Sequence, residues 1–126
     1  MLKQLLLVAA GGATGAACRH LVGIACMRLF GAGFPGGTFA VNVLGSFAMG
    51  VLVELLARRF NMSMELRLLV ATGFLGGFTT FSSFSLDAVG LFERGATMAA
   101  FAYVVGSVLI GITALFAGLA LGRALA

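Results

Sequence analysis

Charged residues are scarce in this chain, and tryptophan is absent. Only 10% of its 126 residues are Asp, Glu, Lys or Arg, whereas 61% are hydrophobic. Soluble domains carry about 25% charged residues, so this composition excludes a soluble domain. The chain is expected to be an integral membrane protein.

Histidine and cysteine are also scarce, which excludes most catalytic and metal-binding chemistry. Cys18 and Cys26 are about 12 Å apart along one predicted helix, too far for a disulfide. These two thiols and the single His20 do not have the spacing of a metal site. No nucleophile and base lie within reach of each other, and no phosphate-binding loop is present. The sequence therefore does not indicate an enzyme.

Four apolar segments are long enough to cross a bilayer, because a spanning helix needs about 20 residues. They cover residues 5–27, 38–57, 66–91 and 97–122. We expect one all-α membrane domain over residues 1–126, with lipid as its surroundings. A secretory signal is the alternative for the first segment, but that segment stays apolar beyond Arg19, longer than a signal requires.

Basic residues lie mostly near the ends of the predicted helices, where lipid headgroups account for them, and they indicate no nucleic-acid site. Arg19 and His20 are expected to reach toward the interface, and a vestibule that attracts anions is the alternative for Arg19. One side would hold five basic residues and the other two, or three if Arg19 is added, which favours cytoplasmic termini. The five are Lys3, Arg58, Arg59, Arg67 and Arg123, and the two are Arg28 and Arg94.

Small and polar residues repeat every four positions along the second span, as Asn42, Ser46, Gly50 and Glu54. This spacing places them on one helix face, which must point away from lipid. An unpaired amide is costly in hydrocarbon, so Asn42 either bonds a neighbouring helix or lines a hydrated path. Glu54 is expected to pair with Arg58 and Arg59. Tyr103, Ser107 and Gly111 form a similar stripe on the fourth span.

The third span contains GFLGGFTTFSSFS at residues 73–85, which is rich in glycine and hydroxyl groups. Such a segment is not expected to be an unbroken helix. We expect an unwound stretch from Gly76 to Thr80. Freed backbone groups are tolerated in a membrane only where protein or water satisfies them, so the break predicts a site.

The available groups are donors without a full charge: Asn42, Ser82, Ser85, Tyr103, Ser107 and the ring edges of Phe81 and Phe84. Aromatic edges carry the positive end of the ring quadrupole and can hold an anion weakly. Such donors suit a small, strongly hydrated anion, whereas the carbonyls of the break suit a monovalent cation. Spacing alone also allows Phe78, Phe81 and Phe84 to form a packing ridge.

Three motifs resemble the Fluc fluoride channels of the CrcB family. GFLGGFTTFSSFS is similar to the family's GxxGGxTTFSTFS signature in the third helix. GGATGAACR resembles its glycine-rich first helix, and GTFAVNVLGSF resembles its GTLxxNxxGxF second helix. The resemblance covers essentially the whole chain, with Ser83 replacing the commoner threonine and Gly111 replacing a frequent hydroxyl.

The resemblance implies an antiparallel, dual-topology homodimer with two fluoride pathways and a central structural sodium ion. It implies that the backbone carbonyls of Gly76 and Thr79 bind sodium, and that Arg19 lies in a vestibule. Combined with the uncharged donors above, it gives an expected fluoride pathway that contains Asn42, Phe81, Ser82, Phe84, Ser85, Tyr103 and Ser107. The basic residues are distributed less evenly than strict dual topology suggests.

The resulting interpretation is a passive channel in a bacterial inner membrane, through which fluoride leaves the cytoplasm. The alternative is a small multidrug-resistance-type transporter, which also has four spans. Such transporters carry a carboxylate in the middle of the first helix, where this chain reads AAGGATGAA. A non-conducting accessory subunit would leave the polar break unexplained.

Overall fold

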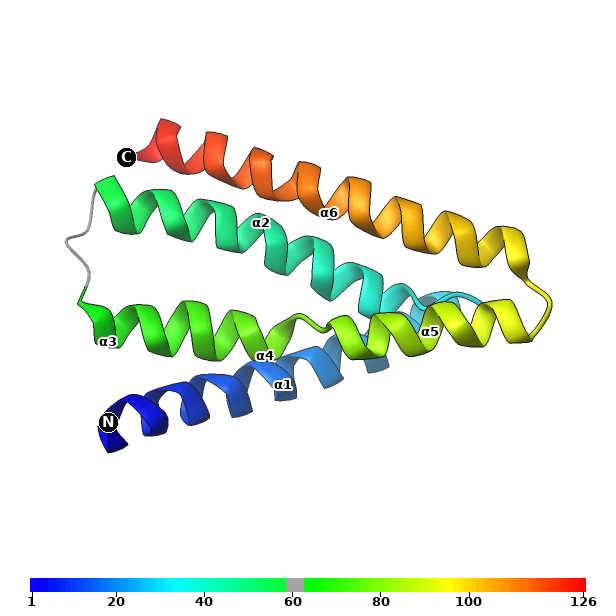
Figure 1. Ribbon diagram of the computed structural model, residues 1–126, viewed down its shortest axis with the longest axis horizontal. Helices are drawn as coiled ribbons and strands as arrows, with labels where there is room; N and C mark the ends of the chain where they lie inside the picture. Colours follow the sequence, from blue (N-terminus) through cyan, green and yellow to red (C-terminus); the bar gives the residue numbers. More distant parts are fainter. Residues whose placement is uncertain (59–62) are drawn as a thin grey trace.

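The fold consists of four long helical spans that run in alternating directions (Figure 1). A computed structural model describes residues 1–58 and 63–126. The spans are α1 (Leu2–Phe30), α2 (Gly36–Arg58), a composite third span (Met64–Glu93) and α6 (Thr97–Leu125). All four are long and apolar enough to cross a membrane, as the sequence predicts. Both termini lie at the same end of the molecule.

The third span is built from four pieces rather than one helix. They are α3 (Met64–Arg67), the π-helical η1 (Leu68–Leu75), α4 (Gly76–Phe78) and α5 (Phe81–Glu93). Only Thr79 and Thr80 are extended, with φ/ψ of −87°/159° and −153°/124°. The prediction of an unwound stretch from Gly76 was therefore wrong, because Gly76 and Gly77 are helical and the break is two residues long.

Threonine side chains end one helix and begin the next at the break. The Thr79 hydroxyl and the Thr79 N–H both donate to the Leu75 carbonyl, each at 3.0 Å. The Thr80 hydroxyl accepts from the Ser83 N–H at 3.2 Å and so caps α5. Extended backbone with a hydroxyl acceptor is the usual arrangement at a helix N-cap, so the TTFS segment starts a new helix here.

Glycines bring α1 against the third span. A Cβ on Gly15 would lie against the backbone of Phe74 and 2.9 Å from the Phe78 nitrogen. A Cβ on Gly77 would lie 2.5 Å from the Gly12 carbonyl oxygen. Small residues allow such close approach between membrane helices, and a larger side chain at either position would separate them.

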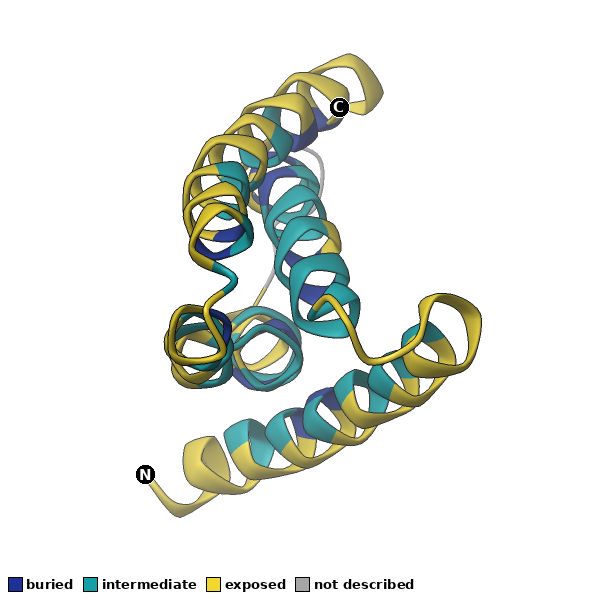
Figure 2. Ribbon diagram, turned by 90° about the vertical axis from the view of Figure 1, so that its right-hand side faces the viewer, coloured by how far each residue is buried: buried dark blue, intermediate teal, exposed yellow. Residues whose placement is uncertain are grey.

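Glycines also allow α2 and α6 to pack closely. A Cβ on Gly118 would lie against the Phe47 carbonyl and 3.0 Å from the Val51 nitrogen, and a Cβ on Gly50 would meet the backbone of α6. Gly50 belongs to the four-residue row predicted on the second span. The buried core is correspondingly small, with Tyr103 and Leu91 at its centre. Many large apolar residues are exposed, and buried positions are few along the helices (Figure 2).

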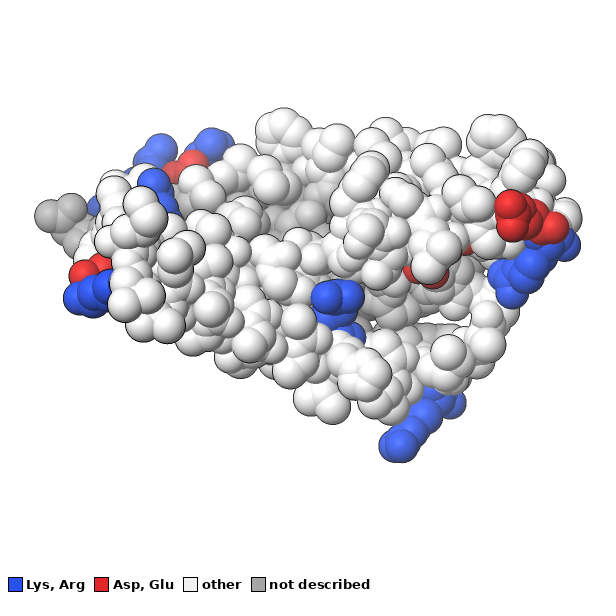
Figure 3. Space-filling model, turned by 60° about the horizontal axis from the view of Figure 1, so that its bottom comes forward, with Lys and Arg blue, Asp and Glu red and all other residues white. Residues whose placement is uncertain are grey.

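Charged side chains lie mainly at the two ends of the molecule, separated by a largely uncharged surface with one basic patch (Figure 3). Glu54 pairs with the Nε of Arg58 at 2.8 Å and with the Nε of Arg123 at 2.9 Å. This confirms the expected pair with Arg58 and adds a partner from α6, whereas Arg59 lies outside the described residues.

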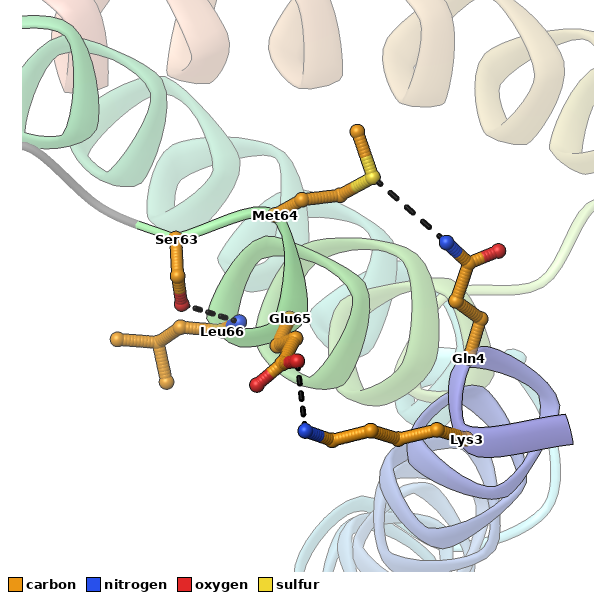
Figure 4. Close-up of polar contacts among 6 residues, drawn as sticks. All are labelled: Lys3, Gln4, Ser63, Met64, Glu65 and Leu66. Atoms are coloured by element: carbon orange, nitrogen blue, oxygen red, sulfur yellow. Dashed lines mark hydrogen bonds and ion pairs between the residues drawn. The ribbon is translucent and has the colours of Figure 1, made fainter. Parts of the chain in front are cut away.

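A second polar cluster ties the start of α1 to the start of the third span (Figure 4). Lys3 pairs with Glu65 at 2.7 Å, and the Gln4 side-chain amide approaches the Met64 sulfur at 3.9 Å. Both partners of the ion pair are largely exposed, so the pair contributes little to stability.

We predict opposite effects for two alanine substitutions on α1. Gly15→Ala should separate α1 from the third span, and overpacking of this kind costs about 1–3 kcal/mol. Gly23 is the matched control, because a Cβ there meets nothing within 4 Å. Gly23→Ala should stabilise the helix by about 0.5–1 kcal/mol. Thermal unfolding in detergent measures both, and equal midpoints would contradict the proposed close packing.

Candidate functional site

The break in the third span is bonded on both sides of Thr80 by a side chain from α2. The Asn42 Nδ2 donates to the Thr80 carbonyl at 3.0 Å, and the Thr80 N–H donates to Asn42 Oδ1 at 2.8 Å. In a continuous helix the Thr80 N–H would donate to the Gly76 carbonyl. Asn42 therefore replaces a peptide group and deprives Gly76 of its usual donor.

Arg19 of α1 bonds the other side of the break. Its Nε donates to the Gly77 carbonyl at 3.1 Å, and its side chain is half-buried. Arg19 therefore has a backbone partner on the third span, a contact that local patterns in the sequence do not predict. The neighbouring His20 is exposed.

Backbone oxygens remain available at the break. No described residue donates a hydrogen bond to the carbonyl of Thr79, and the usual donor to Gly76 is diverted to Asn42. Among the described residues, no three His, Cys, Asp or Glu side chains gather as metal ligands. Backbone carbonyls are therefore the oxygens that the break leaves without hydrogen-bond donors.

The two expected pore phenylalanines lie together on the first turn of α5. The ring centroids of Phe81 and Phe84 are 5.8 Å apart. The ring centroids of Phe84 and Tyr103 are 5.1 Å apart. Phe81 is 80% exposed. Phe78 stacks on Phe74 at 5.9 Å, so it belongs to a separate aromatic pair rather than to a continuous ridge.

Some of the predicted hydroxyl donors already have a hydrogen-bond partner within the chain. Ser85 donates to the Phe81 carbonyl at 3.0 Å, and Ser82 lies 3.5 Å from the Thr80 hydroxyl. The Ser107 hydroxyl oxygen is buried and has no partner among the described residues. A buried hydroxyl without a partner is unfavourable, so Ser107 is the donor best able to receive a ligand.

Tyr103 differs from the expectation of a free donor. Its hydroxyl donates to Asp87 Oδ2 at 3.3 Å, and the residue is buried. Asp87 and Tyr103 are sixteen residues apart in the chain, so this bond joins α5 to α6. The pair leaves Tyr103 less available to a permeating ion.

Two cavities meet at the break, and Thr80 lines both. One, of about 660 Å³, is lined by Arg19, His20 and Arg28. The other, of about 280 Å³, is lined by Asn42, Ser46, Thr79, Thr80 and Phe81, among others. The first is basic and the second carries no charged group, so the break separates two electrostatically different spaces.

Thr80 and Gly77 were not predicted as site residues. Thr80 is detectable in the sequence as a hydroxyl directly before an apolar helix, which is the usual N-cap pattern. Gly77 gives no such signal, because its carbonyl is recognised by a side chain 58 residues away.

Comparison with known proteins identifies the family. The model of the family described as "CrcB-like protein, Camphor Resistance (CrcB)" matches residues 6–119. A protein of Agrobacterium fabrum named "Fluoride-specific ion channel FluC" is 61% identical over 120 residues, covering 95% of this chain and 96% of its own length. Proteins of the same name from Rhizobium leguminosarum bv. trifolii and a Chelativorans species are each 61% identical, over 123 and 122 residues. Each covers at least 97% of this chain and 98% of its own length.

These relatives are named as ion channels, which are not enzymes. With four helices able to span a membrane, the chain is a multi-pass protein of a bacterial membrane. Because the family model matches most of its length, the chain belongs to the CrcB-like protein family.

Proposed function

We propose that this protein is a passive, fluoride-selective channel that lets fluoride leave the cytoplasm down its electrochemical gradient. The observation that carries the proposal is the broken third span, where a phenylalanine pair follows two extended threonines. The relatives named as fluoride-specific channels support the choice of ion. Such a channel needs neither ATP nor a coupled proton.

The groups of the proposed pathway suit fluoride because they offer donors without a fixed positive charge. The ring edges of Phe81 and Phe84 and the free hydroxyl of Ser107 replace part of the lost hydration shell. A full charge in the same space would hold the ion too tightly for conduction. Arg19 lies instead in the basic cavity on the other side of the break.

The proposed assembly is an antiparallel homodimer of dual topology. Phe81 is 80% exposed in the single subunit, and the uncharged cavity beside it is open. A second subunit in the opposite orientation would cover both and complete two pathways. The ion pairs of Glu54 and Glu65 offset part of the positive charge at the end that holds the termini.

The proposed sodium site lies at the dimer axis and uses the carbonyls of Gly76 and Thr79 from both subunits. The residues fit such an ion, because both carbonyls have lost or lack helical donors. Bound sodium would offset the mutual repulsion of the four carbonyl dipoles and so join the subunits. The ion is structural in this proposal and is not transported with fluoride.

A small multidrug-resistance-type transporter is less favoured. Its expected carboxylate in the middle of the first span is absent from this sequence. Within the described spans, Glu54 is held by two arginines and Asp87 by Tyr103. Both carboxylates are therefore already bonded within the chain.

We predict that liposomes containing only this protein release fluoride much faster than chloride. Phe81→Ile and Phe84→Ile should each lower the fluoride flux sharply, because isoleucine keeps apolar bulk but lacks a polarised ring edge. Phe92→Ile is the matched control, since Phe92 is 61% exposed on the same helix. A fluoride electrode measures the flux. Normal flux in both pore variants would contradict the aromatic-edge mechanism, and no fluoride release by the native protein would contradict the proposed function.

We predict that Asn42→Asp lowers fluoride flux more than Asn42→Ala does. Aspartate keeps an acceptor for the Thr80 N–H but loses the donor to the Thr80 carbonyl. It also places a negative charge beside that carbonyl and the anion path, where a low dielectric strengthens repulsion. Efflux from liposomes checks the order, and equal flux in the two variants would exclude the charge effect.

We predict that Gly76→Val weakens the dimer while leaving the fold of each subunit intact. Within one subunit a Cβ on Gly76 meets only the Ala71 carbonyl oxygen, at 3.9 Å, so a clash must come from the second subunit. Thr79→Ser is the control, because it keeps the backbone carbonyl. Dimer dissociation is measured in sodium and in a bulky organic cation. It should depend on the cation in the native protein and in Thr79→Ser, but not in Gly76→Val. A native dimer indifferent to sodium would argue against the ion site.

A further inference from the structure

Arg19 makes a contact that its charge alone does not explain. Its Nε, rather than a terminal nitrogen, donates to the Gly77 carbonyl at 3.1 Å. In a continuous helix this carbonyl would accept from the N–H of Phe81, but the chain turns extended at Thr79. Arg19 therefore supplies the donor that the break removes.

The backbone contact between α1 and α4 fixes where this side chain starts. Gly15 lies against the backbone of Phe74 and Phe78, and Gly12 lies against Gly77. Arg19 is one helical turn beyond Gly15 on the same face of α1. Because α1 and α4 are in backbone contact, the guanidinium of Arg19 lies next to the last helical turn before the break.

Arg19 and Asn42 hold opposite sides of the same short segment. Arg19 binds Gly77, and Asn42 binds both the N–H and the carbonyl of Thr80. Between them lie Phe78 and Thr79. With Gly77 and Thr80 both fixed, the direction of the intervening peptides is fixed as well, and with it the start of α5.

We propose that Arg19 is a positioning residue, which sets the geometry of the break through the Nε–H bond to Gly77. This proposal rests on the proposed fluoride channel for its flux readout. It differs from a role in attracting anions, for which the bond would be incidental. Arg19 does line the basic cavity with His20 and Arg28, so the two roles must be separated by experiment.

Two substitutions separate the donor from the charge. In Arg19→Gln the side-chain nitrogen lies the same number of bonds from Cα as Nε, so the donor is kept and the charge is lost. In Arg19→Lys the charge is kept, but a methylene replaces Nε. Arg28→Gln and Arg28→Lys are the matched controls, because Arg28 lines the same cavity.

The first readout is hydrogen exchange at the Thr80 amide, which donates to Asn42 Oδ1. It reports on the break and requires no ion flux. Arg19→Gln should keep this amide protected as in the native protein, whereas Arg19→Lys should exchange faster. The Arg28 variants should not alter the exchange.

The second readout is fluoride flux at saturating fluoride, where attraction of anions no longer limits the rate. Arg19→Gln should stay within about threefold of the native flux, and Arg19→Lys should lose about tenfold or more, since small misplacements of a functional group have effects of this size. The proposal is overturned if Arg19→Gln fails to protect Thr80, or if Arg19→Lys matches the native protein in exchange and flux. A native protein without fluoride flux would reject the channel, while the exchange measurement would still test Arg19.

Discussion

The structure depends on the need to satisfy backbone polar groups inside a membrane. Each such group left unpaired in hydrocarbon costs several kcal/mol. The two extended residues at the break release groups that a helix would pair, and Asn42 and Arg19 bond Thr80 and Gly77 in return. Two polar side chains in apolar helices are explained by this requirement. Neither side chain bonds the carbonyl of Thr79, so this carbonyl is available to a ligand.

Close helix packing is what allows these two side chains to reach the break. Gly15 and Gly77 bring α1 into backbone contact with α4, and a Cβ on Gly45 of α2 would collide with the Thr79 side chain. An interface of larger residues would hold the helices farther apart, beyond the reach of a short amide such as that of Asn42. The polar side chains can therefore bond the break only because the glycines allow the helices to pack closely.

The sequence predicts the spans and the region of the break, because apolar length and clustered hydroxyls are local signals. It does not predict the extent of the break. Gly76 and Gly77 were interpreted as unwound, yet Gly77 is helical and its missing side chain admits Gly12 of α1. A glycine that permits close approach and one that permits unwinding look alike in a sequence. The bonds of Arg19 to Gly77 and of Tyr103 to Asp87 join different helices, so local patterns do not reveal them.

A helix broken in mid-membrane presents two ends of opposite polarity at one place. The helical run from Met64 to Phe78 ends in carbonyls, which carry the partial negative charge of a helix C-terminus. The new helix α5 begins at Phe81 with N–H groups, which carry partial positive charge and favour anions. The proposed sodium site uses the first end, and the proposed fluoride path passes the second. Because only Thr79 and Thr80 separate the two ends, a single break would serve both the proposed sodium site and the proposed fluoride path.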